Sequence, residues 1–352
     1  MKTFTIGFGI FCIISTIMPF IKSGHWWVRM FDFPHVQVTA MTAIAIALVL
    51  MFLNWGTQGK IVLLCLLVIV FIYQLYILFP YTPLSPKQVV LTQNPNPENV
   101  ISLLCSNVLI ENRDTKKLEA EIKRKNPDII LLLETDDWWM EQVQYLKRDY
   151  SYFKEKPLDN GYGILLYSKK ELINPTLQYL LRDSIPSIIT KVRLDSGKQV
   201  DLFCLHPEPP APQEADKSDQ RDAELLTVSK KLIDKNQPTI VIGDLNDVAW
   251  SKTTRLFQKT SGLLDPRIGR GTFNTFHADY FFFRWPLDHV FHSNHFQLVE
   301  IARLPHIGSD HFPIYASLEY HKVAKEIQER PKANSEEKKE AERIIQKGHA
   351  TK

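Results

Sequence analysis

The chain has 352 residues, 23% of them charged, and a formal net charge of +3. This length accommodates one large domain or two ordinary ones, and so small a net charge gives no bulk electrostatic argument for a nucleic-acid partner. The 4 cysteines are too few for a disulfide scaffold. We expect them to be buried free thiols, with a Cys105–Cys204 bridge as the alternative.

Three apolar runs without charged residues open the chain, at 4–21, 36–53 and 61–80. Each is close to the roughly 20 residues that a helix needs to cross a hydrocarbon core of about 30 Å. Trp26, Trp27 and Trp55 lie at the ends of these runs, where amphipathic rings favour the membrane interface. We therefore predict a membrane anchor of three transmembrane helices over residues 1–82. Buried core helices, or a signal peptide for the first run, are the alternatives.

The cations beside these runs bear on the orientation of the anchor. Lys2 favours a cytoplasmic start, and three spans would then place the remainder of the chain outside the cytoplasm. Lys22 and Arg29 in the first loop favour the opposite orientation. We expect an integral protein of the inner or plasma membrane whose C-terminal part is extracytoplasmic.

The rest of the chain divides into three segments of different composition. Residues 83–99 are rich in Pro, Asn, Thr and Gln and predict a linker or stalk with at most one short strand. Residues 100–320 alternate short apolar runs with polar stretches, with helical patterns at 115–125 and 218–235, which predicts two packed sheets covered by helices. Residues 321–352 alternate Lys and Glu and predict a charged helical or disordered tail without a catalytic role.

Several of the apolar runs end in, or are flanked by, acid, amide or imidazole side chains. These residues are Asn107, Glu134, His206, Asp244, Asn246, Asp288, Asp310 and His311. Taken singly, each has a structural explanation as a turn former, a helix cap or a satisfied histidine. Gathered at one edge of the sheets, the carboxylates would repel one another unless a divalent cation offset their charge. An oxygen-rich set of this kind favours Mg²⁺ or Mn²⁺.

The segments around these residues resemble, in the same order, motifs of the endonuclease/exonuclease/phosphatase superfamily. That superfamily includes deoxyribonuclease-I-like nucleases, abasic-site endonucleases, inositol polyphosphate 5-phosphatases and neutral sphingomyelinases. The matching segments are SNV (106–108), PDIILLLE (127–134), GILLYSK (163–169), HPEPP (206–210), GDLND (243–247), LDHVFHS (287–293) and GSDHFPI (308–314). The resemblance implies an α/β fold, a four-layer α/β/β/α sandwich of two mostly antiparallel sheets over residues 100–320. It also implies metal-dependent hydrolysis of phosphate esters.

The resemblance implies a metal site built mainly from acids. Glu134 would be the principal ligand of Mg²⁺ or Mn²⁺, Asn107 would lie beside the metal or the scissile phosphate, and Asp310 would support the metal. The chain departs from one pattern in the family, because some abasic-site endonucleases carry an acid two positions after the first Asn, where this sequence has Leu109. This departure weakens an identification as a DNA-repair enzyme.

The resemblance also implies a set of catalytic roles. Asp244 would orient and deprotonate the attacking water, while Asn246 would hold a phosphate oxygen and keep Asp244 in place. His311, oriented by Asp288, and His206 would be the two imidazoles at the phosphate. Protonated imidazoles and a cation would then offset the negative charge that develops on the phosphate oxygens.

The substrate is less closely defined by the sequence. Basic and aromatic residues occur together in 267–284, where Arg270 and Arg284 are predicted to bind substrate and Phe281–Phe283 favours packing or membrane contact. We predict a membrane-anchored, nuclease-like phosphodiesterase whose substrate is a nucleic acid or a lipid head group. A lipid phosphodiesterase or phosphomonoesterase, resembling sphingomyelinases or inositol phosphatases, is one alternative. A catalytically inactive membrane receptor or scaffold is the other, and the presence of Glu134, Asp244 and His311 disfavours it.

Overall fold

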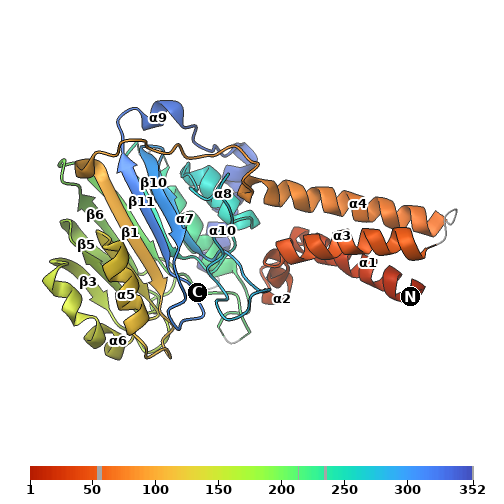
Figure 1. The fold of residues 1–352 in the computed structure, drawn as a ribbon, viewed down its shortest axis with the longest axis horizontal. Helices are drawn as coiled ribbons and strands as arrows, with labels where there is room; N and C mark the ends of the chain where they lie inside the picture. The colour runs from red at the N-terminus through yellow and green to blue at the C-terminus, as the bar shows by residue number, and fades with distance from the viewer. Residues whose placement is uncertain (54–57, 213, 234–235, 351–352) are drawn as a thin grey trace.

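The computed structural model describes residues 1–53, 58–212, 214–233 and 236–350. Trp55, the last two residues of the helix expected at 218–235 and the last two residues of the tail lie outside these ranges. A body of two sheets and surrounding helices occupies one end of the structure, and long N-terminal helices project from its side (Figure 1).

Three apolar helices form this N-terminal bundle, namely α1 (Lys2–Ile17), α3 (His35–Phe52) and α4 (Gln58–Leu78). All three lie in stretches long and apolar enough to cross a membrane. Their contact faces pack small and branched residues together, and Gln74 of α4 donates hydrogen bonds to the hydroxyls of Thr16 and Thr42. Polar contacts of this kind between apolar helices are a common means of helix association in bilayers.

The first sheet has six strands in the order β10-β11-β1-β2-β4-β3, of which β1 and β2 are parallel and the other neighbours antiparallel. Its strands are β1 (Val100–Asn107), β2 (Ile129–Leu133), β3 (Tyr152–Lys156), β4 (Ile164–Ser168), β10 (Phe296–Arg303) and β11 (Ile314–Tyr320). The second sheet has five strands in the order β5-β6-β7-β8-β9, with β7 and β8 parallel. They are β5 (Leu172–Gln178), β6 (Ser187–Arg193), β7 (Gln199–Leu205), β8 (Thr239–Asp244) and β9 (Asp288–His292).

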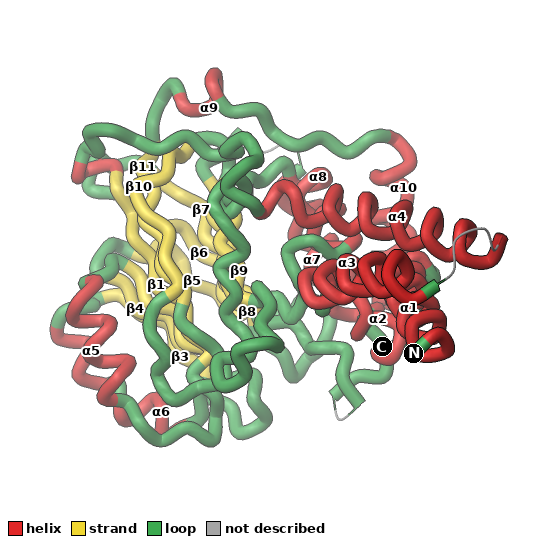
Figure 2. The backbone as a smooth tube through the Cα atoms, turned by 45° about the vertical axis from the view of Figure 1, so that its right-hand side comes forward, coloured by secondary structure: helices red, strands yellow, loops and turns green. Residues whose placement is uncertain are grey.

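The sheets face each other across the main apolar core, and helices cover both outer faces (Figure 2). The first sheet is covered by α5 (Lys116–Lys125), α6 (Asp137–Gln142) and the 3-10 turn η5 (Gln144–Arg148). The second is covered by α7 (Asp219–Leu232), α8 (Lys252–Ser261) and α10 (Ser335–Ala350). The predicted four-layer sandwich of mostly antiparallel sheets is therefore confirmed. All four cysteines are free thiols, and the expectation that they are buried is wrong for Cys65, which is exposed on α4.

The segment expected to be a stalk lies against the sandwich instead. Val89 is fully buried, and Leu91 forms a bridge to Leu298 of β10, which lies at the edge of the first sheet. The short turn η4 (Pro97–Asn99) ends the linker just before β1, and the short helix α9 (Ala324–Ile327) follows β11. Backbone hydrogen bonds link Val90 and Thr92 to Leu298, so the linker extends the sheet edge rather than acting as a free spacer.

The charged tail contains α10, which packs closely on α7. A Cβ atom on Gly348 would lie 2.2 Å from the Cβ of Ala223, so the two helices approach more closely there than a side chain allows. Lys347 adds an ion pair to Asp219 of α7. The polar composition of the tail thus masks a narrow packing face that includes Ala341.

The near end of the helix bundle packs directly on the sandwich. Short turns lie there: η1 (Met18–Phe20), α2 (Trp26–Arg29) and η2 (Met30–Asp32) connect α1 to α3, and η3 (Phe79–Tyr81) follows α4. The hydroxyl of Tyr81 donates to the carbonyl of Ala249 at 2.8 Å, and the indole N–H of Trp250 donates to the carbonyl of Asp32 at 2.8 Å. The loop that follows β8 is therefore held by the N-terminal helices as well as by the sandwich.

Candidate active site

The polar strand ends gather at one edge of the sandwich. Asn107 ends β1, and Glu134 directly follows β2, which is parallel to β1 and therefore ends at the same edge. In the second sheet Asp244 ends β8 and pairs in register with Asp288, the first residue of β9. The strand topology thus places these four side chains at one edge, where the two sheets meet.

Asn107 links the acids of the two sheets. Its amide nitrogen donates to Glu134 Oε1 at 2.6 Å and to Asp244 Oδ2 at 3.2 Å. Burial raises the pKa of Glu134 to about 7, and it also raises the pKa of Asp244. Asp310 adds to the negative charge around Glu134. These carboxylates therefore lie close together in a poorly solvated site, as the sequence predicted.

Such a donor set fits a hard divalent cation. Glu134 has a left-handed backbone with φ of 58°, a costly conformation for a non-glycine residue that concentrates at functional sites. The carboxylates of Glu134 and Asp310 offer oxygen ligands of the type that Mg²⁺ and Mn²⁺ favour, whereas Asn107 Oδ1 accepts from the N–H of Leu109 at 3.1 Å. A cation there would stabilise the ionised carboxylates against the burial and the mutual repulsion that raise their pKa values, so the residues present fit the expected metal.

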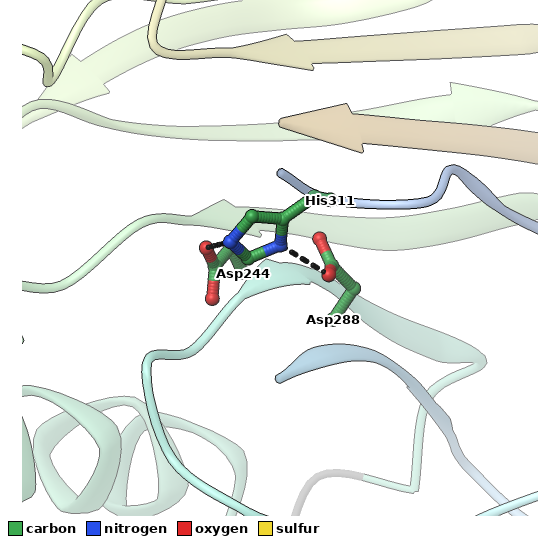
Figure 3. A group of neighbouring side chains, drawn as sticks. All are labelled: Asp244, Asp288 and His311. Carbon is green, nitrogen blue, oxygen red and sulfur yellow. Dashed lines mark hydrogen bonds and ion pairs between the residues drawn. The ribbon is translucent and has the colours of Figure 1, made fainter. Parts of the chain in front are cut away.

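A different group, Asp244, Asp288 and His311, brings its ligand atoms within 4.8 Å of one another (Figure 3). His311 Nδ1 lies 2.8 Å from Asp288 Oδ2, and His311 Nε2 lies 3.6 Å from Asp244 Oδ2. Although burial lowers the pKa of His311, the charges of Asp288 and Asp244 raise it to about 10. A protonated imidazole has no lone pair for a metal, so this group fits a hydrogen-bonding triad better than an ion site.

His206 lies on the other side of Asp244, with Nε2 4.0 Å from Asp244 Oδ2. Burial lowers the pKa of His206, so this imidazole is neutral at neutral pH. The two imidazoles therefore differ in their pKa, because His206 lacks the second carboxylate that His311 has in Asp288. A neutral ring can still donate one hydrogen bond to a phosphate oxygen.

Backbone geometry holds Asp244 in place. A Cβ on the preceding Gly243, whose φ is +151°, would lie 1.8 Å from the carbonyl oxygen of Leu205, so only glycine allows β8 to run this close to β7. On the other side, the N–H of Asn246 donates to Asp244 Oδ1 at 2.9 Å. The Asn246 side chain donates to the carbonyl of Pro207, which ties the loop after His206 to the same turn.

Arg221 of α7 is a buried residue of the site that no motif marks. Its Nη1 donates to the carbonyl of Asn246 at 2.7 Å, and its guanidinium pairs with Asp222 at 2.8 Å and Asp247 at 3.5 Å. Arg221 therefore clamps the backbone of the turn that orients Asp244. In the sequence Arg221 is one charged residue of a helix among others. Only the knowledge that this face of the helix is buried could have indicated its role.

The two arginines expected to bind substrate lie in different places. Arg270 donates to the carbonyls of Pro266 and Val89 and holds the linker, and the structure does not bring it into the catalytic group. Arg284 lies in the loop before β9, where its guanidinium faces the rings of Phe281 and Phe312 at 5.3 and 4.9 Å. Both lie between α8 and β9, but Arg284 donates to the carbonyl of Ala278, whose N–H donates to the carbonyl of Asp310, whereas Arg270 bonds the linker.

Comparisons with known proteins agree with this geometry. The model of the endonuclease/exonuclease/phosphatase family matches residues 104–311. No curated protein matches the chain. Similar solved structures include D. rerio TDP2 with a single-strand DNA product, at 17% identity and a TM-score of 0.52 over 62% of this chain and 99% of that one.

Two further structures have the same fold. The human Nocturnin catalytic domain with a bound sulfate is 18% identical, with a TM-score of 0.52 over 65% of this chain and 97% of that chain. An endonuclease/exonuclease/phosphatase family protein from Bacteroides thetaiotaomicron is 17% identical, with a TM-score of 0.50 over 65% of this chain and 100% of that chain. At this level of identity these likenesses support the fold, and they leave the substrate open.

Proposed function

The chain belongs to the endonuclease/exonuclease/phosphatase family, and from that premise we propose that it is a membrane-anchored, divalent-metal-dependent phosphodiesterase. Members of this family hydrolyse phosphate esters, so the chain is a hydrolase of that class. The observation that carries the finer proposal is the buried cluster in which Glu134 and Asp244 share Asn107 opposite the His311–Asp288 pair.

Asp244 is the proposed base for the attacking water. Its carboxylate is buried, and burial raises its pKa, which makes it a better proton acceptor than an exposed aspartate. The backbone N–H of Asn246 fixes Oδ1, so Oδ2 is the oxygen that faces the two imidazoles. A water between this oxygen and a bound phosphorus would lose its proton to Asp244 as it attacks.

His311 is the proposed donor to the phosphate. It carries a proton at neutral pH because Asp288 and Asp244 stabilise the imidazolium, and it can therefore offset charge that develops on the phosphate oxygens. His206 is placed to donate a hydrogen bond to the phosphate from an uncharged ring. A divalent cation held by Glu134, with Asn107 and Asp310 beside it, would neutralise further charge on the phosphate when bound.

We take residues 1–82 as the membrane anchor, 83–99 as a packed linker, 100–320 as the catalytic domain and 321–352 as the tail. Lys2 and Lys60 lie at the starts of α1 and α4, the end of the bundle away from the sandwich. Cations favour the cytoplasmic side, so the proposal places the catalytic domain on the extracytoplasmic side. Protease should cut the domain in intact spheroplasts, and protection of the domain there would contradict this orientation.

The proposed activity is tested with the full chain in detergent micelles and bis-p-nitrophenyl phosphate as substrate. Hydrolysis should require Mg²⁺ or Mn²⁺ and should stop with a chelator. Asp244→Asn should lower the rate by about a hundredfold or more, because an amide cannot accept the water's proton. Asp195→Asn is the matched control, since Asp195 is an exposed acid paired with Lys170. Wild-type rates in Asp244→Asn would show that the assigned base is wrong.

A further inference from the structure

The loop between α8 and β9 carries an exposed aromatic tip. Tyr280, Phe281, Phe282 and Phe283 are 59%, 72%, 76% and 57% exposed. Four consecutive large rings facing solvent form a patch of the kind that marks a contact surface. We call residues 280–283 the aromatic tip.

The aromatic tip is attached to the first turn of a candidate membrane span. Gln37, the third residue of α3, donates from Nε2 to the carbonyl of Phe282 at 2.6 Å. Trp285, at the base of the tip, packs edge-on against Phe33 at 5.7 Å between ring centroids. With a rise of about 1.5 Å per residue, Gln37 lies only a few ångströms inside the start of α3. The tip is therefore level with the membrane interface of a bundle that crosses the bilayer.

The same loop contacts the catalytic turn. The N–H of Ala278 donates to the carbonyl of Asp310 at 2.6 Å. The ring of Phe276 lies 4.9 Å from that of His311, His277 lies 4.9 Å from Phe276, and Tyr280 lies 4.6 Å from His277. A continuous series of rings thus connects the imidazole of the active site to the exposed tip.

A second loop of the active site also touches the near end of the bundle. It follows His206, and its backbone pairs with the turn before α2: the N–H of Trp26 donates to Asp216, and the N–H of Ser218 donates to Gly24. Two loops that flank the catalytic cluster are therefore fixed to the interface end of the helices. The catalytic cluster consequently lies beside the surface of the bilayer in which the helices would sit.

We propose that the aromatic tip enters the head-group region beside α3, and that the phosphodiester delivered to Asp244 and His311 is the head group of a membrane lipid. This inference rests on the proposed function and specifies its substrate class. The ring of Tyr280 carries a hydroxyl and favours the interface, and the three Phe rings add apolar surface of the kind that interfacial segments bury. The guanidinium of Arg284 at the base of the tip adds a cation at the depth of lipid phosphates.

The reaction consumes one water. The water oxygen forms a bond to phosphorus as Asp244 takes its proton, and the P–O bond to one of the two alcohols breaks. The released alkoxide takes up a proton, and the phosphate remains as a monoester of the other alcohol. The head-group diester of a glycerophospholipid or a sphingophospholipid would react in the same way.

The first test uses the full chain reconstituted into two sets of vesicles, phosphatidylethanolamine with phosphatidylglycerol, and phosphatidylcholine with sphingomyelin. ³¹P NMR follows conversion of lipid diester into monoester, and bis-p-nitrophenyl phosphate reports the soluble activity of the same sample. Wild type should convert lipid. The variant F281S/F282S should lose lipid turnover about tenfold or more and keep the soluble activity, because each ring contributes apolar area to the bilayer contact.

Y152S/F153S is the matched control, since Tyr152 and Phe153 are 40% and 42% exposed on β3, in the other sheet. It should leave both activities unchanged. Wild type that cleaves bis-p-nitrophenyl phosphate or plasmid DNA but no lipid would overturn the inference and leave the proposed function standing. Wild type that cleaves none of these would instead overturn the proposed function. Full lipid turnover in F281S/F282S would also refute the role of the tip.

A second measurement is independent of catalysis. A nitroxide label on F282C, in a C65S background because Cys65 is an exposed thiol, reports which medium surrounds the tip. Electron paramagnetic resonance should show the label more accessible to oxygen than to a water-soluble nickel complex. A label on Y152C should show the reverse order. Equal, water-like accessibility at both positions would refute insertion.

Discussion

Two buried groups of charged residues lie close together in this protein, and they differ in how their charges are balanced. The catalytic cluster contains Asn107, Glu134, His206, Asp244, Asp288, Asp310 and His311. The anchor network contains Arg29, Asp32, Arg221, Asp222 and Asp247, and there each acid lies within 3.5 Å of a guanidinium. Among the described residues, by contrast, no lysine or arginine forms an ion pair with a carboxylate of the catalytic cluster.

This difference indicates what each group does. Buried acids that are paired with arginine are satisfied within the protein, and they serve to hold elements together. Burial raises the pKa of acids in both groups, Asp32 and Asp247 as well as Glu134 and Asp244. The difference lies in their partners, because Glu134 and Asp244 have only amide or imidazole partners among the described residues. A bound cation would stabilise such carboxylates most. The anchor network is therefore the structural frame, and the catalytic cluster is the part that we propose to bind metal and substrate.

A substitution that disrupts the anchor network, the structural frame, should produce the largest of the expected effects, a loss of stability. Arg221→Met removes the cation from Asp222 and Asp247 and leaves both acids buried, which should lower the free energy of unfolding by about 3 kcal/mol or more. Thermal unfolding of the full chain in detergent micelles measures the effect. Arg255→Met is the control, because Arg255 lies in the neighbouring helix α8, where its Nε donates to the backbone carbonyl of Ser251 and, among the described residues, it forms no ion pair with an acid. Equal stability of the two variants would show that the network does not hold the fold.

Breaking the catalytic cluster should affect the rate and leave the stability nearly unchanged. Asp288→Asn weakens the partner that keeps His311 protonated and oriented, so kcat on bis-p-nitrophenyl phosphate should fall by about a hundredfold. The melting temperature should stay within a few degrees of wild type, because the amide can still occupy the same space. A large loss of stability without a selective loss of kcat would place Asp288 in the frame instead.

A third buried acid sharpens the comparison, because it belongs to neither group. Glu224 of α7 accepts a hydrogen bond from Ser187 at 3.2 Å, and burial raises its pKa to about 7. The folded state therefore keeps the carboxyl protonated at pH values where the unfolded chain ionises it. The stability due to this group is fully present below about pH 4.5 and is lost as the pH rises through about 7.

Glu224→Gln should remove this pH dependence. At pH 8 the variant should be more stable than wild type by about 2 kcal/mol, and at pH 4.5 the two should be nearly equal. Melting curves across this pH range measure the difference. A constant difference between the variant and wild type at every pH would contradict the assigned pKa.

Several residues of the catalytic cluster were predictable from sequence because they lie at or just after strand ends. β1 with β2, and β7 with β8, are parallel pairs, so the polar residues that end or follow these strands meet at one edge of each sheet. Edge strands were harder to recognise: β3 reads YFKEK, and β5 includes Pro175, so neither has the apolar run of a central strand. Charges and proline on edges are a common protection against edge pairing, and they hide the strand from pattern analysis.

Contacts made through the backbone were not predictable from sequence. Arg270 was expected to bind substrate because it is basic and lies near aromatic residues, yet it holds the carbonyl of Val89. Composition cannot distinguish a guanidinium that faces a ligand from one that donates a hydrogen bond to a backbone carbonyl. The clamp of Arg221 on Asn246 and the packing of the linker depend in the same way on tertiary arrangement.

The hydrogen bonds from Tyr81 to Ala249 and from Trp250 to Asp32 have a consequence for any shortened form of the protein. If the helices cross a bilayer as proposed, cleavage near residue 82 would release the sandwich from it and would also remove two hydrogen bonds that hold the loop just beyond Asp244. Release and loss of activity would then be one event, so we expect a fragment released into solution to be inactive.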